Sequence, residues 1–473
     1  MVDGRALTAQ FEDAADFETR KVLCGGQLLT VLFLDGLTSG RDIAEQVVRP
    51  LAQMTDEARE EVLYTRALQG GVWCASVKEP ESTQQAAELL VNGFCVILFP
   101  KSGKALGCEV KTGEKRSPSP PETENTVKGA KDAFTETLRT NTSLVRRHLR
   151  TPGLRLAETV VGKRALTKVT VCWIDRLTDP ELPRRMQERL SSIDIDGALS
   201  PAAIEEYVTG SRRTAFPLLE YTERTDHFCQ GLLDGQVGLL ADGLPLGYLA
   251  PVGLGRLMRS PEDRATDFLS ASMLRLLRYA ALGVSLLLPA LYAAMAMFHQ
   301  QMLPTKLLMS IIESKQNVPF STLLEVLGLL CAFELLQQAG LHLPQAVGTA
   351  VSIIGGLVVG TAAVDAKLVS PAALIVTASS GICGFTLPNR ELSDAVRLWR
   401  FVLTVLAGLW GLFGVTVGLL LLLTELAGLE SLGRSYLSPF GRAEVKGALV
   451  RPRLVRQKWR DGALKPMDNQ NQR

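Results

Sequence analysis

The C-terminal half of the chain contains two long runs without a charged residue. Tyr279–Phe298 spans twenty residues and Phe401–Thr424 spans twenty-four, and no comparable run precedes Tyr279. A helix needs about 20 apolar residues to cross roughly 30 Å of hydrocarbon. Both runs therefore predict membrane-spanning helices, the alternative being a buried helix of a large soluble core.

Further apolar segments lie between these two runs, and they are less regular. The apolar segments of this half are near residues 279–298, 321–341, 345–364, 368–387 and 401–424. The stretch Met302–Phe320 carries two prolines and three charged residues, which favours an interfacial or re-entrant position. Residues 266–430 are therefore predicted to form an all-α, multi-span membrane domain.

The N-terminal half contains an internal duplication. Leu29–Thr38 reads LTVLFLDGLT and Val169–Thr178 reads VTVCWIDRLT, each a β-rich run before a charged amphipathic helix. A second pair, Ala87–Ala105 and Cys229–Gly247, has a helix ending at Asn-Gly or Asp-Gly and then a hairpin. The offsets between the paired segments are 140 and 142 residues, so we predict two related α/β subdomains.

These patterns divide the chain into five parts. Residues 1–110 form the first α/β subdomain, 111–126 a Pro-rich charged linker, and 127–265 a linker helix plus the second subdomain. Residues 266–430 form the membrane domain and 431–473 a basic tail. The linker helix is expected to run from Val127 to about Arg150. Its basic end, LVRRHLR, fits a helix C-terminus better than a nucleic-acid contact, because no aromatic residues are interleaved with it.

The motifs and residue spacings of the chain argue against an enzyme and against a metal-binding protein. No nucleotide-binding loop, hydrolase motif or metalloprotease motif occurs, so we expect no enzyme activity, no catalytic residue and no cofactor. Eight scattered cysteines without a C-x-x-C pair, and four histidines away from ligand spacing, indicate free thiols and no metal site. The first twenty residues lack the apolar core of a signal peptide, which predicts a cytoplasmic soluble half.

The basic tail raises a question of topology. It carries ten Lys and Arg residues after Thr424, and so by the positive-inside rule it belongs in the cytoplasm with the N-terminus. Five full spans would place it on the other side of the membrane. We therefore expect one of the five segments to be a half-span or a tilted interfacial helix.

Two acids within an apolar segment are the strongest candidates for a functional site. Glu325 and Glu334 are nine residues apart, which at about 100° per residue places them on opposite faces of a helix. An ionised side chain at membrane depth costs at least about 2.5 kcal/mol unless it finds a partner or water. The alternative to a functional role is that both acids lie near the membrane interfaces, where they reach water or stay neutral.

Each acid has polar or small neighbours on its own face. Glu325 is expected with Ser321 and Gly328, where small side chains leave room for water along an ion path. Glu334 is expected with Gln337 and Gln338, which suit hydrogen bonds to a neighbouring helix, between protomers in particular. Helix-interface candidates on the next segment recur every four residues: Gly348, Ser352, Gly356 and Gly360. This stripe permits close packing, either within one protomer or between protomers.

From Asn125 onward the chain resembles the GerA family of spore germination proteins. The segments that carry the resemblance are 127–150, 221–245, 260–263, 318–344, 351–371 and 387–401. They include VKGAKDAFTETLRTNTSLVRRHLR, YTERTDHFCQGLLDGQVGLLADGLP and LPNRELSDAVRLWRF. This chain departs from the family pattern at Gln337-Gln338, where Arg-Glu is common, and at Thr361, where Gln is common.

The resemblance implies an A subunit of a spore germinant receptor, or the related stage V sporulation protein AF. Such a subunit is expected in the spore inner membrane, in contact with membrane lipid, beside a transporter-like B subunit and a lipoprotein C subunit. It implies a homo-oligomer that conducts monovalent cations when a nutrient is sensed. The alternative is a membrane-anchored scaffold that organises germination partners without conducting ions.

Overall fold

The computed structural model describes most of the chain. The described residues are 2–55, 59–111, 121, 124, 128–197, 200–210, 213–342, 360–438, 440, 447, 449–453, 455, 457–460 and 462–471. They form two compact units: Met1–Arg212 with Leu219–Pro251 and Gln457–Arg473, and Arg213–Leu218 with Val252–Arg456. The predicted linker, 111–126, lies almost wholly outside the described residues, so the predicted domain boundaries stay predictions.

The first subdomain is a five-stranded sheet between two helical layers. Its strands are β1 (Phe17–Cys24), β2 (Gln27–Leu34), β3 (Val77–Lys78), β4 (Phe94–Phe99) and β5 (Lys104–Glu109). Its helices are α1 (Gly4–Ala9), α2 (Gly40–Asp42), η1 (Ile43–Val48), α3 (Arg49–Gln53), α4 (Glu60–Arg66), η2 (Ala67–Gly71) and α5 (Thr83–Val91).

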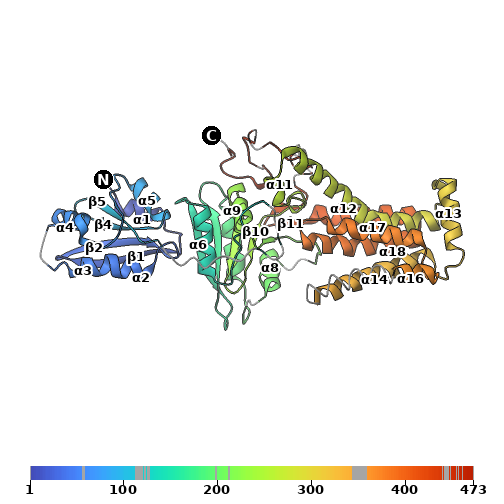
Figure 1. Cartoon of the computed structure of the whole chain (residues 1–473), viewed down its shortest axis with the longest axis horizontal. Coiled ribbons are helices and arrows are strands. Elements are labelled where there is room, and N and C mark those ends of the chain that lie inside the picture. Colours follow the sequence, from blue (N-terminus) through green and yellow to red (C-terminus); the bar gives the residue numbers. More distant parts are fainter. Residues whose placement is uncertain are drawn as a thin grey trace. The chain divides into compact units, whose positions relative to one another are not determined.

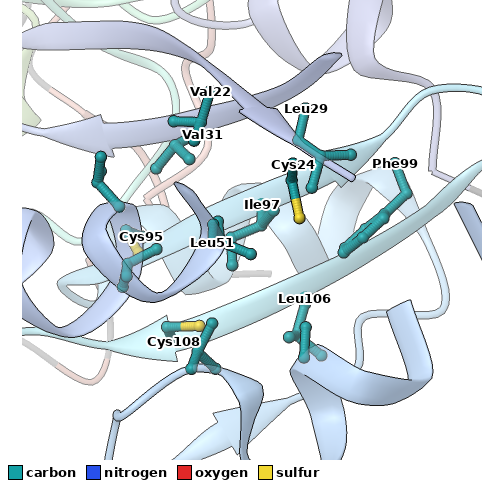
Figure 2. Packing of buried hydrophobic residues seen from close by; sticks show 14 of the residues in the cluster. Val22, Cys24, Leu29, Val31, Leu51, Cys95, Ile97, Phe99, Leu106 and Cys108 are labelled. Carbon is teal, nitrogen blue, oxygen red and sulfur yellow. The ribbon is translucent and has the colours of Figure 1, made fainter. Parts of the chain in front are cut away.

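Successive side chains along the strands of this sheet point to opposite faces and contribute to two separate cores. Val31 and Ile97 face η1, α3 and α4, whereas Leu32 and Val96 face α1 and α5. Figure 2 shows the first of these cores, in which Cys95 and other small and aliphatic side chains fill the space between sheet and helices. All eight cysteines of the chain carry free thiols.

The second subdomain repeats the order of the first. Its strands are β6 (Leu154–Val161), β7 (Thr167–Ile174), β8 (Glu220–Thr222), β9 (Val237–Ala241) and β10 (Gly247–Ala250). Its helices are α6 (Leu138–His148), α7 (Glu181–Ser191), α8 (Pro201–Thr209) and α9 (Thr225–Asp234). A short helix of the tail, η6 (Gly462–Leu464), belongs to the same compact unit.

The shared strand order confirms the two related subdomains. The sheets are ordered β1-β2-β4-β5-β3 and β6-β7-β9-β10-β8, and all their strand pairs are antiparallel. The predicted helix-to-hairpin turns occur in both halves, where Gly93 (φ +80°) and Gly235 (φ +99°) follow α5 and α9. These left-handed conformations are the ones that glycine adopts without strain.

The helix expected from Val127 is shorter than the sequence suggests. It begins at Leu138, whose backbone N–H donates to Asp242 Oδ1 at 2.9 Å. Before it, Ala133 forms an antiparallel bridge with Arg224, and the N–H of Phe134 donates to the carbonyl of Glu223 at 2.8 Å. Tertiary pairing therefore overrides the helical pattern of this stretch.

The second unit is a bundle of helices (Figure 1). Its elements are α10 (Leu254–Leu257), α11 (Glu262–Ala265), α12 (Phe268–Met297), η3 (Gln300–Met302), α13 (Thr305–Lys315), α14 (Thr322–His342), α16 (Gly360–Asp365), α17 (Pro371–Phe385), α18 (Arg390–Gly428), β11 (Glu430–Ser431) and β12 (Arg434–Ser435). Among the described residues three helices, α12, α14 and α18, are long and apolar enough to cross a membrane. The predicted segment 368–387 forms α17, whose fifteen residues are fewer than the roughly 20 of a full span.

The last apolar run is a helical hairpin instead of the single span expected. Gly411 has φ +62° and ψ −142°, a conformation outside the helical region and open essentially to glycine alone. Beyond it the chain folds back, so that Gly414 lies against the carbonyl of Leu406 and Gly418 against the side chain of Leu403. In a continuous helix residues fifteen apart are separated by about 22 Å. Residues 390–410 and 412–428 are therefore two antiparallel arms.

The hairpin brings the exit of the membrane unit back to its entrance. The N–H of Leu254 donates to the carbonyl of Tyr436 at 2.9 Å, and the N–H of Val252 donates to Ser431 Oγ at 3.0 Å. At the other end of the bundle Gly411 packs against His299, just after α12, so closely that a Cβ at this position would lie 2.8 Å from the imidazole ring. The segment that enters α12 and the segment that leaves α18 consequently lie at the same end of this unit.

Candidate functional site in the helical bundle

Glu325 is buried where helices α14 and α17 meet. It lies in the first turn of α14 and is 2% exposed. Its Oε1 accepts a hydrogen bond from the backbone N–H of Ser370, the N-cap residue of α17. The positive end of the α17 dipole therefore faces this carboxylate and stabilises its charge. Its second oxygen, Oε2, is buried and has no hydrogen-bond partner among the described residues.

A lysine and a threonine lie beside this carboxylate. Lys315, at the end of α13, donates from Nζ to Thr322 Oγ1 at the start of α14. Burial lowers the pKa of Lys315, and the negative charge of Glu325 opposes that shift. The positive charge of Lys315 and the negative charge of Glu325 therefore interact electrostatically.

The structure does not bring Ser321 and Gly328 into the buried surroundings of Glu325. Both are exposed, and Ser321 precedes the helix, where its Oγ accepts from the N–H of Leu324 at 3.4 Å. Among the described residues, and apart from the backbone of its own helix, no atom lies within 4 Å of the place where a Cβ on Gly328 would stand. The role of these two residues beside an ion path stays a prediction.

Glu334 faces a different helix from Glu325. Arg397 of α18 donates from Nη1 to Glu334 Oε1 at 2.8 Å and to Gln337 Oε1 at 2.7 Å, and it also pairs with Asp394. Gln338 is exposed. An arginine in place of Gln337 would have no oxygen to accept this bond, so the departure from the family pattern changes a contact that is made within this chain.

Arg400 is a buried cation that the sequence reading missed. It is 1% exposed, and its Nη1 donates to Ser380 Oγ at 3.2 Å, which in turn donates to the carbonyl of Ser285 at 2.7 Å. Its Nε and Nη2 have no hydrogen-bond partner in the described part of the chain, and neither does the hydroxyl of Ser285. Arg400 directly precedes the uncharged run that begins at Phe401, and this adjacency was the available signal.

Small residues allow the helices around these side chains to pack closely. A Cβ on Gly384 of α17 would lie only 3.2 Å from Ser285 Oγ of α12, and Gly381 lies against the ring of Phe333 on α14. Gly360 is buried beside Leu374, whereas Gly348, Ser352 and Gly356 lie outside the described residues. The interface role predicted for that stripe stays a prediction.

A pocket of about 310 Å³ opens between α14, α17 and α18. It is lined by Gln337, Gly384, Phe385, Leu387, Pro388, Arg390, Ser393 and Arg397. No group of three or more His, Cys, Asp or Glu residues in the described ranges could hold a metal ion. Among the described residues the polar features of α14, α17 and α18 include one acid at a helix N-terminus, one acid–arginine pair and one incompletely paired arginine.

Comparison with known sequences places the chain in a family. The sequence model of the family "Bacillus/Clostridium GerA spore germination protein" matches residues 5–466. The chain belongs to the GerA family. Family membership extends the resemblance found from Asn125 onward to nearly the whole sequence, including the first subdomain.

The relatives of this GerA family member include spore germination proteins. The chain is 34% identical to spore germination protein KA of Bacillus subtilis, over 93% of this chain and 81% of that one. It is 32% identical to spore germination protein GerLA of Bacillus cereus, over 91% and 88%. It is also 35% identical to the uncharacterized membrane protein YfkQ of B. subtilis, over 94% and 87%.

One solved structure is similar to the soluble half. It is the crystal structure of the N-terminal domain of the A subunit of the Bacillus megaterium spore germinant receptor GerK3. The match covers 52% of this chain and 92% of that one, with 22% identity and a TM-score of 0.41.

Proposed function

We propose that this chain is the A subunit of a spore germinant receptor and that it forms the oligomeric, ion-conducting component. The family supports a role in spore germination. Buried Glu325 supports conduction most directly, because an acid at membrane depth needs water, a cation or a proton to offset its desolvation. Its Oε2 has no partner among the described residues, so it can coordinate a passing cation.

The partners and location follow from this proposal. A receptor of this kind would combine the chain with a transporter-like B subunit and a lipoprotein C subunit in the spore inner membrane. The soluble half would lie in the cytoplasm, since the exit of α18 lies at the same end as the entrance of α12 and the tail after it is basic. No catalytic step is part of the proposal.

Substitution of the acid tests conduction. Glu325→Gln keeps the shape of the side chain and its hydrogen bond from Ser370 but removes the charge. We expect spores with this variant to release monovalent cations several-fold more slowly on exposure to germinant, while the protein keeps its normal level and mass. Normal release by Glu325→Gln spores would overturn the assignment of Glu325.

A matched control distinguishes the effect of removing the charge of Glu325 from the effect of removing a negative charge elsewhere in the bundle. Glu313→Gln makes the same change on α13, where Glu313 is exposed, and should leave release unchanged. Light scattering of the detergent-purified chain tests the oligomer independently. A closed homo-oligomer supports conduction, whereas a monomer with unaltered cation release in both variants favours a membrane-anchored scaffold.

A further inference from the structure

Arginines gather around one buried carboxylate where α12 begins. Asp263 of α11 is 2% exposed and accepts from Arg275 Nη2 at 3.1 Å and from Arg278 Nη1 at 2.8 Å. A single carboxylate thus faces two guanidinium groups of α12. The start of the helix is fixed to α11, and the pairing leaves an excess of positive charge.

The C-terminal segment adds two further arginines at the same place. Arg451 donates to the backbone carbonyls of Thr266 and, at 3.2 Å, Arg264. The guanidinium of Arg453 lies 5.2 Å from the centre of the Phe268 ring. We call the following five residues the arginine collar: Arg264, Arg275, Arg278, Arg451 and Arg453. Arg275 and Arg451 are buried, whereas Arg264 and Arg453 are exposed. Only three acids, Glu262, Asp263 and Asp267, lie in the surrounding stretch 256–278.

An exposed apolar stripe runs along the first turns of α12 beside the collar. Leu269 is 76% exposed and Met273 67%, and Leu276 and Leu277 continue the same side at helical spacing. The stripe leads directly into the uncharged run that begins at Tyr279. At 1.5 Å per residue α12 is about 45 Å long, longer than the roughly 30 Å of hydrocarbon. Its first turns therefore fall at the level of the lipid head groups.

We propose that the arginine collar and this stripe bind anionic phospholipid. The guanidinium groups of exposed Arg264 and Arg453 match phosphate in geometry and charge, and basic residues beside a span attract acidic head groups. The continuity of the stripe with the spanning run favours lipid over a soluble partner, because acyl chains cover both surfaces together. The lipid binds in the head-group layer at the end of the bundle where the chain enters and leaves.

The test uses the full-length protein purified in a neutral detergent. Short-chain phosphatidylglycerol should raise the melting temperature in a saturable manner that weakens with added salt, whereas phosphatidylcholine of the same chain length should not. Arg264→Gln/Arg453→Gln should weaken the apparent affinity for phosphatidylglycerol by about tenfold or more. The control Lys306→Gln/Lys367→Gln removes two exposed charges of the same unit outside the collar and should change nothing.

Further measurements distinguish lipid from other occupants. Leu269→Ser/Met273→Ser should also weaken phosphatidylglycerol binding, and inorganic phosphate should not compete with the lipid. Equal effects of the two phospholipids would overturn the proposal, as would full competition by inorganic phosphate, which indicates a site for free anions. Concentration-dependent association that the stripe variant abolishes without any lipid dependence would identify a second copy as the occupant.

Discussion

Two buried arginines show how differently the chain treats charge in its two units. Arg146 donates to both oxygens of buried Asp16 at 2.7 Å and to the carbonyl of Leu154 at 3.2 Å. This pair joins α6 of the second subdomain to the residues before β1 in the first. Arg400, equally buried, has one partner hydroxyl and two nitrogens without partners among the described residues. The Arg146–Asp16 pair stabilises the fold. Burial of Arg400 costs desolvation free energy that its single hydrogen bond, to Ser380, does not offset.

The same substitution at these two positions should therefore have opposite effects. Arg146→Met leaves Asp16 as a buried, unpaired charge and should destabilise the protein by about 3–5 kcal/mol. Arg400→Met removes an incompletely paired charge and should leave the melting temperature unchanged or raise it. Thermal unfolding of both variants in detergent checks the pair. A large loss of stability in Arg400→Met would mean that its guanidinium is fully satisfied in the folded protein.

Asp132 predicts a pH dependence that belongs to the second subdomain. Burial alone would raise the pKa of this carboxyl, but hydrogen bonds from His148 and Thr225 outweigh it and hold the pKa below its usual range. A depressed folded-state pKa contributes stability above the unfolded pKa, and that contribution is lost as the pH falls through the folded pKa.

Asp132→Asn should accordingly lower the melting temperature at neutral pH. The difference from the unmodified chain should persist down to about pH 4, near the pKa of an unfolded Asp, and shrink below it. Asp194→Asn is the matched control, because Asp194 is 73% exposed in its pair with Lys163 and such surface pairs are worth little. A constant difference across the acid range would show that the Asp132 charge does not stabilise the fold.

At the scale of elements, the repeats of the soluble half could be predicted from sequence and the membrane hairpin could not. Strand, turn and helix patterns recur at the same offset, so aligned segments report the shared topology. The run 401–424 is predicted as one span because a hydropathy profile does not show whether the chain continues or turns back. A turn inside an uncharged run contains no polar residues that would mark it. The glycines at 408, 411, 414 and 418 were the remaining indication, since two helical arms pack closely only over small residues.

Of the candidate site, the two acids could be singled out from the sequence, but their partners could not. Glu325 and Glu334 stood out because acids are rare in apolar segments, and each of them does face another helix. Their partners did not stand out, since Ser370 contributes a backbone N–H and Arg397 lies in a stretch of ordinary polarity. Which groups meet depends on helix packing, and one sequence does not contain that information.

A single glycine should decide whether the hairpin forms. Gly411→Ala places a Cβ in a conformation that L-residues avoid and 2.8 Å from the His299 ring, so it should cost roughly 1–3 kcal/mol or more. We expect a lower melting temperature and less protein in the membrane. Gly283→Ala on α12 is the control, because its Cβ would meet no atom of another described element within 4 Å and alanine favours a helix. Equal behaviour of the two variants would argue for a continuous helix at 411.

At the scale of the whole molecule, the hairpin answers the topological question that the basic tail poses. Residues 412–428 carry the chain back along 390–410, so the tail leaves the bundle at the end where α12 starts. This reversal is consistent with the tail and the N-terminal half sharing one side of the membrane, as the basic tail predicts. The arginine collar lies at that same end, which adds positive charge to the side expected to be cytoplasmic.

Site-directed labelling should locate both ends of the bundle. Single cysteines at Asp3 and Ser435, in a chain whose native cysteines are replaced by serine, should resist a membrane-impermeant thiol reagent in intact cells. A cysteine at Gln300, exposed just beyond α12 at the opposite end, should react under the same conditions. Permeabilisation should make all three react, which excludes burial as the cause of protection. Labelling of Ser435 together with Gln300 in intact cells would place the tail outside and contradict the reversal at Gly411, whereas labelling of Asp3 alone would reject the cytoplasmic position of the N-terminus.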